Sequence, residues 1–131
     1  MGIQNYYSQV VRDFKAKNES NNKDRTMMLD VLRAELYEGY KQEFIFVVNH
    51  FKVSGNYAWF EGNAQRKDGK PIKFSDYAYD CCRVTTLFKK SNEKWDILES
   101  GAFCTDVCYA GICSRYRSAP RAIFPSGNIY D

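Results

Sequence analysis

The segment 43–65 reads EFIFVVNHFKVSGNYAWFEGNAQ, and it decides the fold of this chain. Two runs rich in β-branched and aromatic residues, 43–53 and 57–65, flank the turn sequence SGN at 54–56. This order is typical of a β-hairpin. Each run is also too short to cross a membrane as a helix. We therefore expect two antiparallel strands here.

The first of these strands is apolar on both faces. Strict alternation places its side chains in two rows: Ile45, Val47, Phe51 and Val53 on one face, and Phe44, Phe46, Val48 and His50 on the other. A strand that is apolar on both faces is expected to be buried on both. A helix on each side, a concave sheet around a pocket, or a second subunit on the outer face would each bury it. The sequence does not choose between these arrangements, and a homodimer is one of them.

Downstream of the hairpin, the sequence predicts three more strands. A short one is expected at 71–74, and two longer ones at 82–90 and 94–100 flank the polar turn SNE at 91–93. The connections are too short for crossovers, so the sheet should be antiparallel.

The ends of the chain read as helical. Apolar spacing predicts helices at 4–16 and 25–41, with Asp24 as the cap of the second one. A short terminal helix should run from Thr105 or Asp106 to about residue 117, and the prolines that follow should keep the tail extended.

This element order predicts a single α+β domain over residues 1–131. Two N-terminal helices would pack on an antiparallel β-meander of four to five strands, followed by a short C-terminal helix and an extended tail. The net charge of +3 is small and the basic residues are spread out, so nucleic acid is not predicted as a partner. No apolar run is long enough for a membrane span. No signal peptide is visible, so an exported protein would have lost its leader before this sequence begins.

Five cysteines lie in the second half of the chain, at Cys81, Cys82, Cys104, Cys108 and Cys113. They lack the paired spacing of a zinc site or a Cys-x-x-Cys redox site. Free, buried cysteines in a cytosolic protein are one interpretation. Disulfides are favoured, because five clustered cysteines are more than a cytosolic protein usually carries. Disulfides in turn imply a periplasmic or secreted protein. Since a vicinal disulfide strains the peptide, we expect Cys81 or Cys82 to bond to one of the other three.

The candidate catalytic groups are His50, Asp30 and Asp106. His50 is the only histidine, so any histidine-based acid–base chemistry must use it, although a half-exposed strand residue is the simpler interpretation. Asp30 either pairs with Arg33 on the helix surface or reaches a polar pocket. Asp106 is either a helix cap or a functional carboxylate. No nucleophile elbow or phosphate loop is present, and neither a cofactor nor a metal is predicted.

Five residues are candidates for binding a partner or ligand: Arg33, Trp59, Arg115, Tyr116 and Arg121. The last three, together with Arg117, form a basic patch that could take an anion or a partner, or simply be solvated. Trp59 is either a binding platform or part of cross-strand packing.

Several motifs together resemble a family of small, uncharacterised bacterial proteins that usually carry export signals. They are LDVLR at 29–33, FVV at 46–48, FKVSGNYAWF at 51–60, and PRAIFP at 120–125. The resemblance covers most of 26–125 and implies export and a helix–hairpin–meander order. It implies no catalytic residue, and the cysteines depart from the family pattern. The layout also resembles cystatin-like and nuclear-transport-factor-like folds, which is an analogy of fold only.

These observations predict an exported bacterial domain that binds a protein partner or small ligand without catalysis. Two alternatives stay open. One is an acid–base enzyme with a small pocket of the nuclear-transport-factor-like type. The other is a thiol redox protein that uses Cys81 or Cys82.

Overall fold

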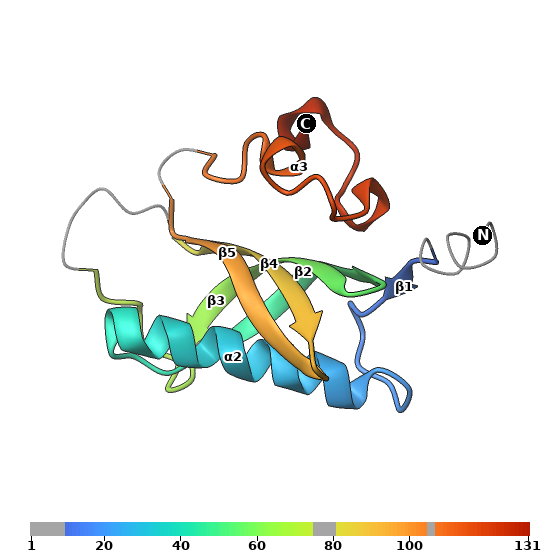
Figure 1. Cartoon of the computed structure of the whole chain (residues 1–131). Helices are drawn as coiled ribbons and strands as arrows, with labels where there is room; N and C mark the ends of the chain where they lie inside the picture. The colour runs from blue at the N-terminus through green and yellow to red at the C-terminus, as the bar shows by residue number, and fades with distance from the viewer. Residues whose placement is uncertain (1–9, 75–80, 105–106) are drawn as a thin grey trace, which may run out of the picture.

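A five-stranded antiparallel sheet forms the centre of the protein. The computed structural model describes residues 10–74, 81–104 and 107–131. The strands follow one another across the sheet in chain order: β1 (Arg12–Asp13), β2 (Phe44–Ser54), β3 (Tyr57–Arg66), β4 (Arg83–Ser91) and β5 (Lys94–Ala102). The helix α2 (Asn22–Tyr40) covers one face, and residues 107–131 lie over the other (Figure 1). The predicted α+β class and antiparallel sheet are confirmed.

Both long hairpins follow from their turns. In the β2–β3 hairpin, Gly55 has a φ of 57°, which glycine adopts without steric cost. In the β4–β5 hairpin, Asn92 and Glu93 have φ angles of 52° and 64°, the combination that a two-residue type I′ turn requires. These turns fix the register, with Ser54 opposite Tyr57 in the first hairpin.

The main core lies between α2 and the sheet. Four residues at helical spacing, Met28, Leu29, Leu32 and Leu36, are buried on the inner side of α2. They join a cluster of sheet aromatics in which the Phe51 and Phe60 rings meet edge to face at 5.3 Å. Burying each such side chain contributes roughly 1.5–3 kcal/mol, so this layer provides the largest stabilising term.

The start of α2 differs from the prediction, because Asp24 is not its cap. The capping position is Asn21, and Asp24 lies inside the first turn. Its carboxylate accepts from the indole Nε1 of Trp95 at 3.1 Å and from Lys90 at 3.4 Å. Asp24 therefore ties the helix to the β4–β5 hairpin.

The predicted first helix is wrong over residues 10–16, and the rest of that segment lies outside the described residues. Arg12 and Asp13 pair with Val53 and Lys52, and the N–H of Phe14 donates to the Phe51 carbonyl at 2.7 Å. The Phe14 ring is buried in the core. Pairing with β2 and burial of this ring outweigh the helical spacing.

The other corrections concern 71–74 and the C-terminus. No strand forms at 71–74. The described helix α3 covers only Ile112–Arg115 and is shorter than predicted, while Thr105 and Asp106 lie outside the described residues. The tail is not extended, because it contains the 3-10 turns η1 (Arg121–Ile123) and η2 (Asn128–Tyr130) and folds back on the sheet. Among the helices described, none has the length and apolar character needed to cross a membrane.

Candidate functional site

One edge of the sheet is open over half of its length. The strand β1 pairs with β2 only at Lys52 and Val53. Residues 44–50 of β2 have no strand neighbour on that side within the described part of the chain. We call residues 44–50 the open edge. An edge of this kind offers backbone N–H and C=O groups to an added strand.

The direction of the backbone at the open edge can be derived from its neighbours. The carbonyl of Glu43 points toward the β3 side, because it accepts from the N–H of Lys67 at 2.9 Å. The carbonyl of Val47 points the same way, since a Cβ built on Gly62 would lie 2.7 Å from it. Backbone groups alternate along a strand. Phe44, Phe46 and Val48 therefore direct theirs outward.

Apolar side chains at the open edge are exposed. Ile45 and Val47 on β2 are 44% and 47% exposed, and Tyr37 on α2 is 48% exposed. The predicted pattern grouped Ile45 and Val47 with Phe51, which is wrong. A bulge between Val48 and His50 shifts the alternation, so Phe51 enters the core while Ile45 and Val47 face outward.

A groove of about 800 Å³ lies beside the start of the open edge. Its lining comes from α2, from the start of β2 with the residue before it, and from the residue after β3: Arg33, Ala34, Tyr37, Glu43, Phe44, Ile45 and Lys67. A groove between a helix and an open strand edge has the shape that suits an extended polypeptide segment.

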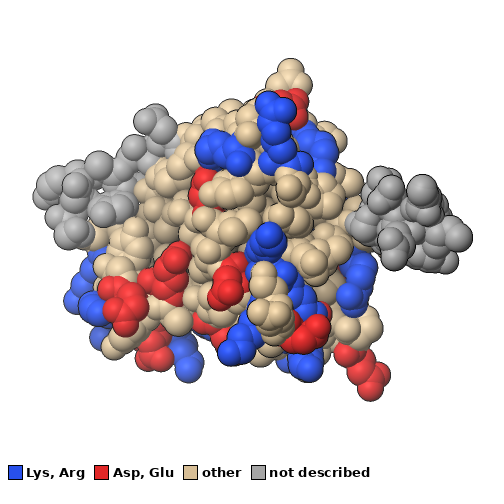
Figure 2. All heavy atoms as spheres, viewed as in Figure 1, with Lys and Arg blue, Asp and Glu red and all other residues tan. Residues whose placement is uncertain are grey.

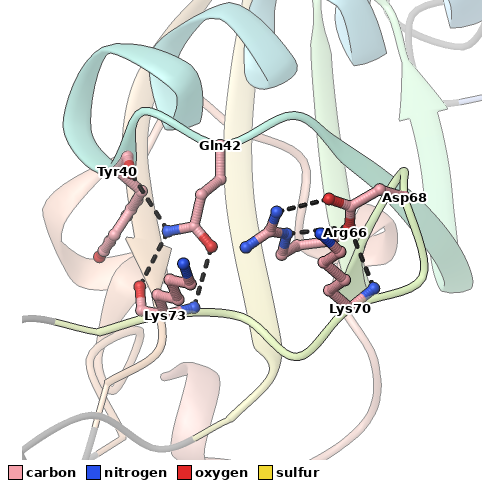
Figure 3. Close-up of polar contacts among 6 residues, drawn as sticks. All are labelled: Tyr40, Gln42, Arg66, Asp68, Lys70 and Lys73. Carbon is pink, nitrogen blue, oxygen red and sulfur yellow. Dashed lines mark hydrogen bonds and ion pairs between the residues drawn. The ribbon is translucent and has the colours of Figure 1, made fainter.

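Polar contacts around the end of α2 lie next to this groove (Figure 3). The side chain of Gln42 donates to the carbonyls of Tyr40 at 3.1 Å and Lys73 at 2.8 Å, and accepts from the Lys73 N–H at 2.9 Å. Arg66 and Asp68 form an ion pair across the neighbouring turn. These contacts keep residues 66–73 against the helix end and leave the groove formed in advance.

The opposite edge of the sheet, β5, is protected in a way that the open edge is not. Its sequence includes Lys94, Asp96 and Glu99, whereas residues 44–50 contain no Lys, Arg, Asp or Glu. The hydroxyl of Tyr116 also donates to the Leu98 carbonyl at 3.4 Å. Charged side chains on an edge discourage pairing with another chain. The two edges of this sheet therefore differ in their capacity for association.

Charged side chains elsewhere on the surface are mixed in sign. Figure 2 shows Lys, Arg, Asp and Glu intermingled over the lower half of the molecule, where α2 lies, and a largely uncharged upper half with basic side chains near the top. This mixture indicates a solvated helix face and gives no single-sign field for a charged partner.

A second polar centre lies under the C-terminal residues 107–131, which we call the C-terminal segment. Glu61 on β3 is only 8% exposed, and its carboxylate accepts from Trp59 Nε1 at 2.7 Å, from Arg83 at 2.7 Å and from the Tyr130 hydroxyl. Burial, followed by the hydrogen bond to Glu61, raises the pKa of Tyr130 well above its usual range. Each buried donor is matched to an acceptor, so this centre anchors the C-terminal segment to the sheet.

The structure does not bring the described catalytic candidates together. His50 Nε2 lies 2.7 Å from the Ile123 carbonyl and hydrogen bonds to it, on the sheet face under the C-terminal segment. Asp30 lies on α2, covering the other face, and pairs with Arg33 at 2.6 Å. Asp106 lies outside the described residues.

The binding candidates have different surroundings. Arg33 lines the groove, whereas Trp59 is buried under Phe124 and Tyr130 and offers no exposed platform. Arg115 binds the Glu99 carboxylate through two nitrogens, and the same contact raises the pKa of Arg115.

Two further members of the predicted basic patch, Tyr116 and Arg121, also have local partners. Burial first, and then the charge of Glu99, raises the pKa of Tyr116. Arg121 pairs with Asp131 at 3.0 Å and donates to carbonyls of the tail. These contacts favour a structural role over an anion site.

The cysteines pair differently from the prediction. Cys81 and Cys82 form one pair, and Cys104 and Cys108 form another with their Cα atoms 6.2 Å apart, so neither bond links strand to tail. Cys82 packs toward the α2 core, whereas the second pair lies against Gly101 on the opposite face. The sheet itself separates them.

Cys113 is the free thiol. Burial raises its pKa, which disfavours the reactive thiolate. Among the residues described, no group of three or more His, Cys, Asp or Glu side chains could hold a metal ion.

No protein-family model, curated protein sequence or solved structure matches this chain in the comparisons made. The site therefore has to be interpreted from its own geometry. Sequence reasoning identified the strand that carries the open edge but missed Tyr37, Lys67 and Glu61. Tyr37 could have been found from the sequence, because it is an aromatic residue off the apolar stripe of the predicted helix.

Proposed function

We propose that this protein is a non-enzymatic binding domain that takes an extended polypeptide segment onto the open edge of β2. The observation that carries the proposal is the contrast between the two sheet edges. Residues 44–48 are all apolar, residues 44–50 contain no Lys, Arg, Asp or Glu, and a preformed groove flanks them, whereas β5 carries charges. Exposed apolar surface that borders a groove is characteristic of interaction sites.

The binding mode follows from the backbone. Phe44, Phe46 and Val48 present their N–H and C=O groups to an incoming strand, which would add to the sheet through main-chain hydrogen bonds. Exposed Ile45 and Val47 would contact alternate side chains of that strand on one face, and Tyr37 would flank it on the other. Apolar, β-branched side chains at alternate positions are therefore favoured in the partner.

We further propose that the protein works in an oxidising compartment, as a secreted or periplasmic protein. The support is the pair Cys104 and Cys108, together with the vicinal pair, since cysteines paired as disulfides persist mainly outside the cytosol. Thiol titration of protein purified without reductant tests this: one free thiol is expected, and five would contradict it.

A peptide-binding experiment tests the binding function. The probe is a synthetic peptide with the sequence of residues 43–50, EFIFVVNH, extended by lysines for solubility. At protein concentrations where the chain is monomeric, it should shift the backbone amide NMR signals of Phe44, Phe46 and Val48 and slow their hydrogen exchange.

N-methylated peptides supply the matched control. Methyl groups on the amides that copy Phe46 and Val48 remove the pairing donors and should abolish binding. Methyl groups on the amides that copy Ile45 and Val47 face away from the edge and should leave binding intact. If no peptide perturbs these amides at about 1 mM, a concentration at which even weak binding registers, the proposed function is wrong.

A further inference from the structure

We infer that the partner at the open edge is a second copy of this chain, paired antiparallel through β2. The inference rests on the proposed function and names its partner. It arises from the self-complementarity of residues 44–48: the same short strand supplies outward backbone groups, exposed apolar side chains and no charge. A twofold dimer requires this property, because each patch must fit itself.

The direction of the backbone groups fixes the register. Only Phe44, Phe46 and Val48 can hydrogen bond outward, so they must face one another across the dimer. The symmetric solution has Phe46 opposite Phe46 of the second copy, and Phe44 opposite Val48 of the second copy. This arrangement forms about six inter-strand hydrogen bonds.

The side chains agree with this register. Ile45 of one copy falls opposite Val47 of the other, in a non-hydrogen-bonded pair where side chains approach most closely. The two residues that the fold leaves 44% and 47% exposed would thus cover each other. At each end of the pairing, Glu43 of one copy lies opposite Asn49 of the other. Asn49 has a neutral amide side chain, so no two like charges face each other.

The ends of the open edge also agree with this register. At one end, β1 already occupies the edge at Lys52 and Val53, and Phe14 donates to the Phe51 carbonyl. The bulge at Asn49 bends the strand just before that point. The free stretch is therefore limited to the residues that the symmetric register uses. Two five-stranded sheets would become one continuous sheet.

The dimer interface is small, so the affinity between the two copies is expected to be weak. A pairing of five residues, with flanking contacts from α2, buries less than the roughly 1,200 Å² typical of stable interfaces. We therefore expect a dimer that dissociates on dilution rather than a permanent one.

Sedimentation analysis of the full chain from about 1 to about 500 micromolar tests the inference over the range where weak interfaces dissociate. The wild type should change from monomer to dimer as the concentration rises. Val47→Lys should raise the dissociation constant at least about tenfold, because it places two cations in the pairing. Leu98→Lys is the matched control, a 37% exposed residue on the opposite edge strand, and should dimerise like the wild type.

The register has its own test, which requires no variant. In a mixture of isotope-labelled and unlabelled wild-type chains, an intermolecular NOE should connect the Ile45 and Val47 methyl groups.

Ile45→Lys provides a second variant for the sedimentation experiment if Val47→Lys fails to fold, as judged by circular dichroism.

The outcomes separate the inference from the proposed function. A wild type that stays monomeric but binds the EFIFVVNH peptide overturns the dimer and leaves the binding function standing. A dimer that Val47→Lys does not weaken, or that lacks the NOE, also overturns the inference, because it uses another surface. A monomer that binds no peptide overturns both.

Discussion

Replacing Glu61 tests whether this buried carboxylate holds the C-terminal segment on the sheet. In Glu61→Ala the buried Trp59 indole and the buried Tyr130 hydroxyl both lose their acceptor. Each unsatisfied donor costs about 1–3 kcal/mol. Arg83 is half-exposed, so losing its ion pair adds only about 0–1 kcal/mol. We expect a total loss of about 2–7 kcal/mol in the free energy of unfolding.

Glu61→Gln is the matched variant that separates hydrogen bonding from charge. Trp59 and Tyr130 both donate to the same carboxylate oxygen, so the amide oxygen of glutamine can take that position. The amide NH₂ group would then face Arg83, which can turn to solvent. This variant should lose only about 1–2 kcal/mol, since hydrogen bonds to a neutral acceptor are weaker than those to a charged one.

Urea unfolding followed by fluorescence and far-UV circular dichroism measures both losses. Hydrogen exchange of the C-terminal segment shows whether that segment loosens before the rest of the protein. If Glu61→Ala loses less than about 1 kcal/mol, the buried donors do not depend on this acceptor. If Glu61→Gln loses as much as Glu61→Ala, the charge outweighs the hydrogen bonds and the reasoning fails.

Four further results are expected. Phe14→Ala should lower the free energy of unfolding in urea by about 3–5 kcal/mol, because the ring is 1% exposed in the core; a surface helix residue would lose far less. Gly101→Ala places a methyl group against the Cys108 sulfur and should lower the melting temperature of the oxidised protein, with a smaller loss after reduction. The raised pKa of Tyr130 means that the unfolded chain releases this proton first, so stability should fall above about pH 10, and Tyr130→Phe should flatten that fall in urea titrations at pH 8–11. Cys113→Ser should reduce the thiol titre of denatured, unreduced protein from one to zero, and any thiol left would contradict the two pairs.

Local patterns were sufficient for much of the fold. The hairpins at 54–57 and 91–94 depend on turn residues within a few positions, and α2 depends on apolar spacing along one segment. These elements agree with the prediction because their signals are carried by neighbours in sequence. The strand that bears the candidate site was also recognisable from its apolar residues.

The faces of that strand were not predictable in the same way. Strict alternation places Ile45 and Phe51 on one face, but one extra residue in the bulge reverses the sides from His50 onward. The bulge depends on how β3 pairs with β2. At this point of the pairing, residue 62 is a glycine, because the Val47 carbonyl leaves no room for a side chain there. The open edge therefore became visible only once the strands were paired.

The sequence by itself determined the α+β class, the antiparallel hairpins, the long helix and the absence of a membrane-spanning apolar run. The tertiary structure decided that residues 12–14 join the sheet instead of a helix, which cysteines pair, and that the tail folds back over Glu61. Each of these depends on contacts between residues far apart in the chain, and their free energies exceed the local preferences that a sequence pattern reports.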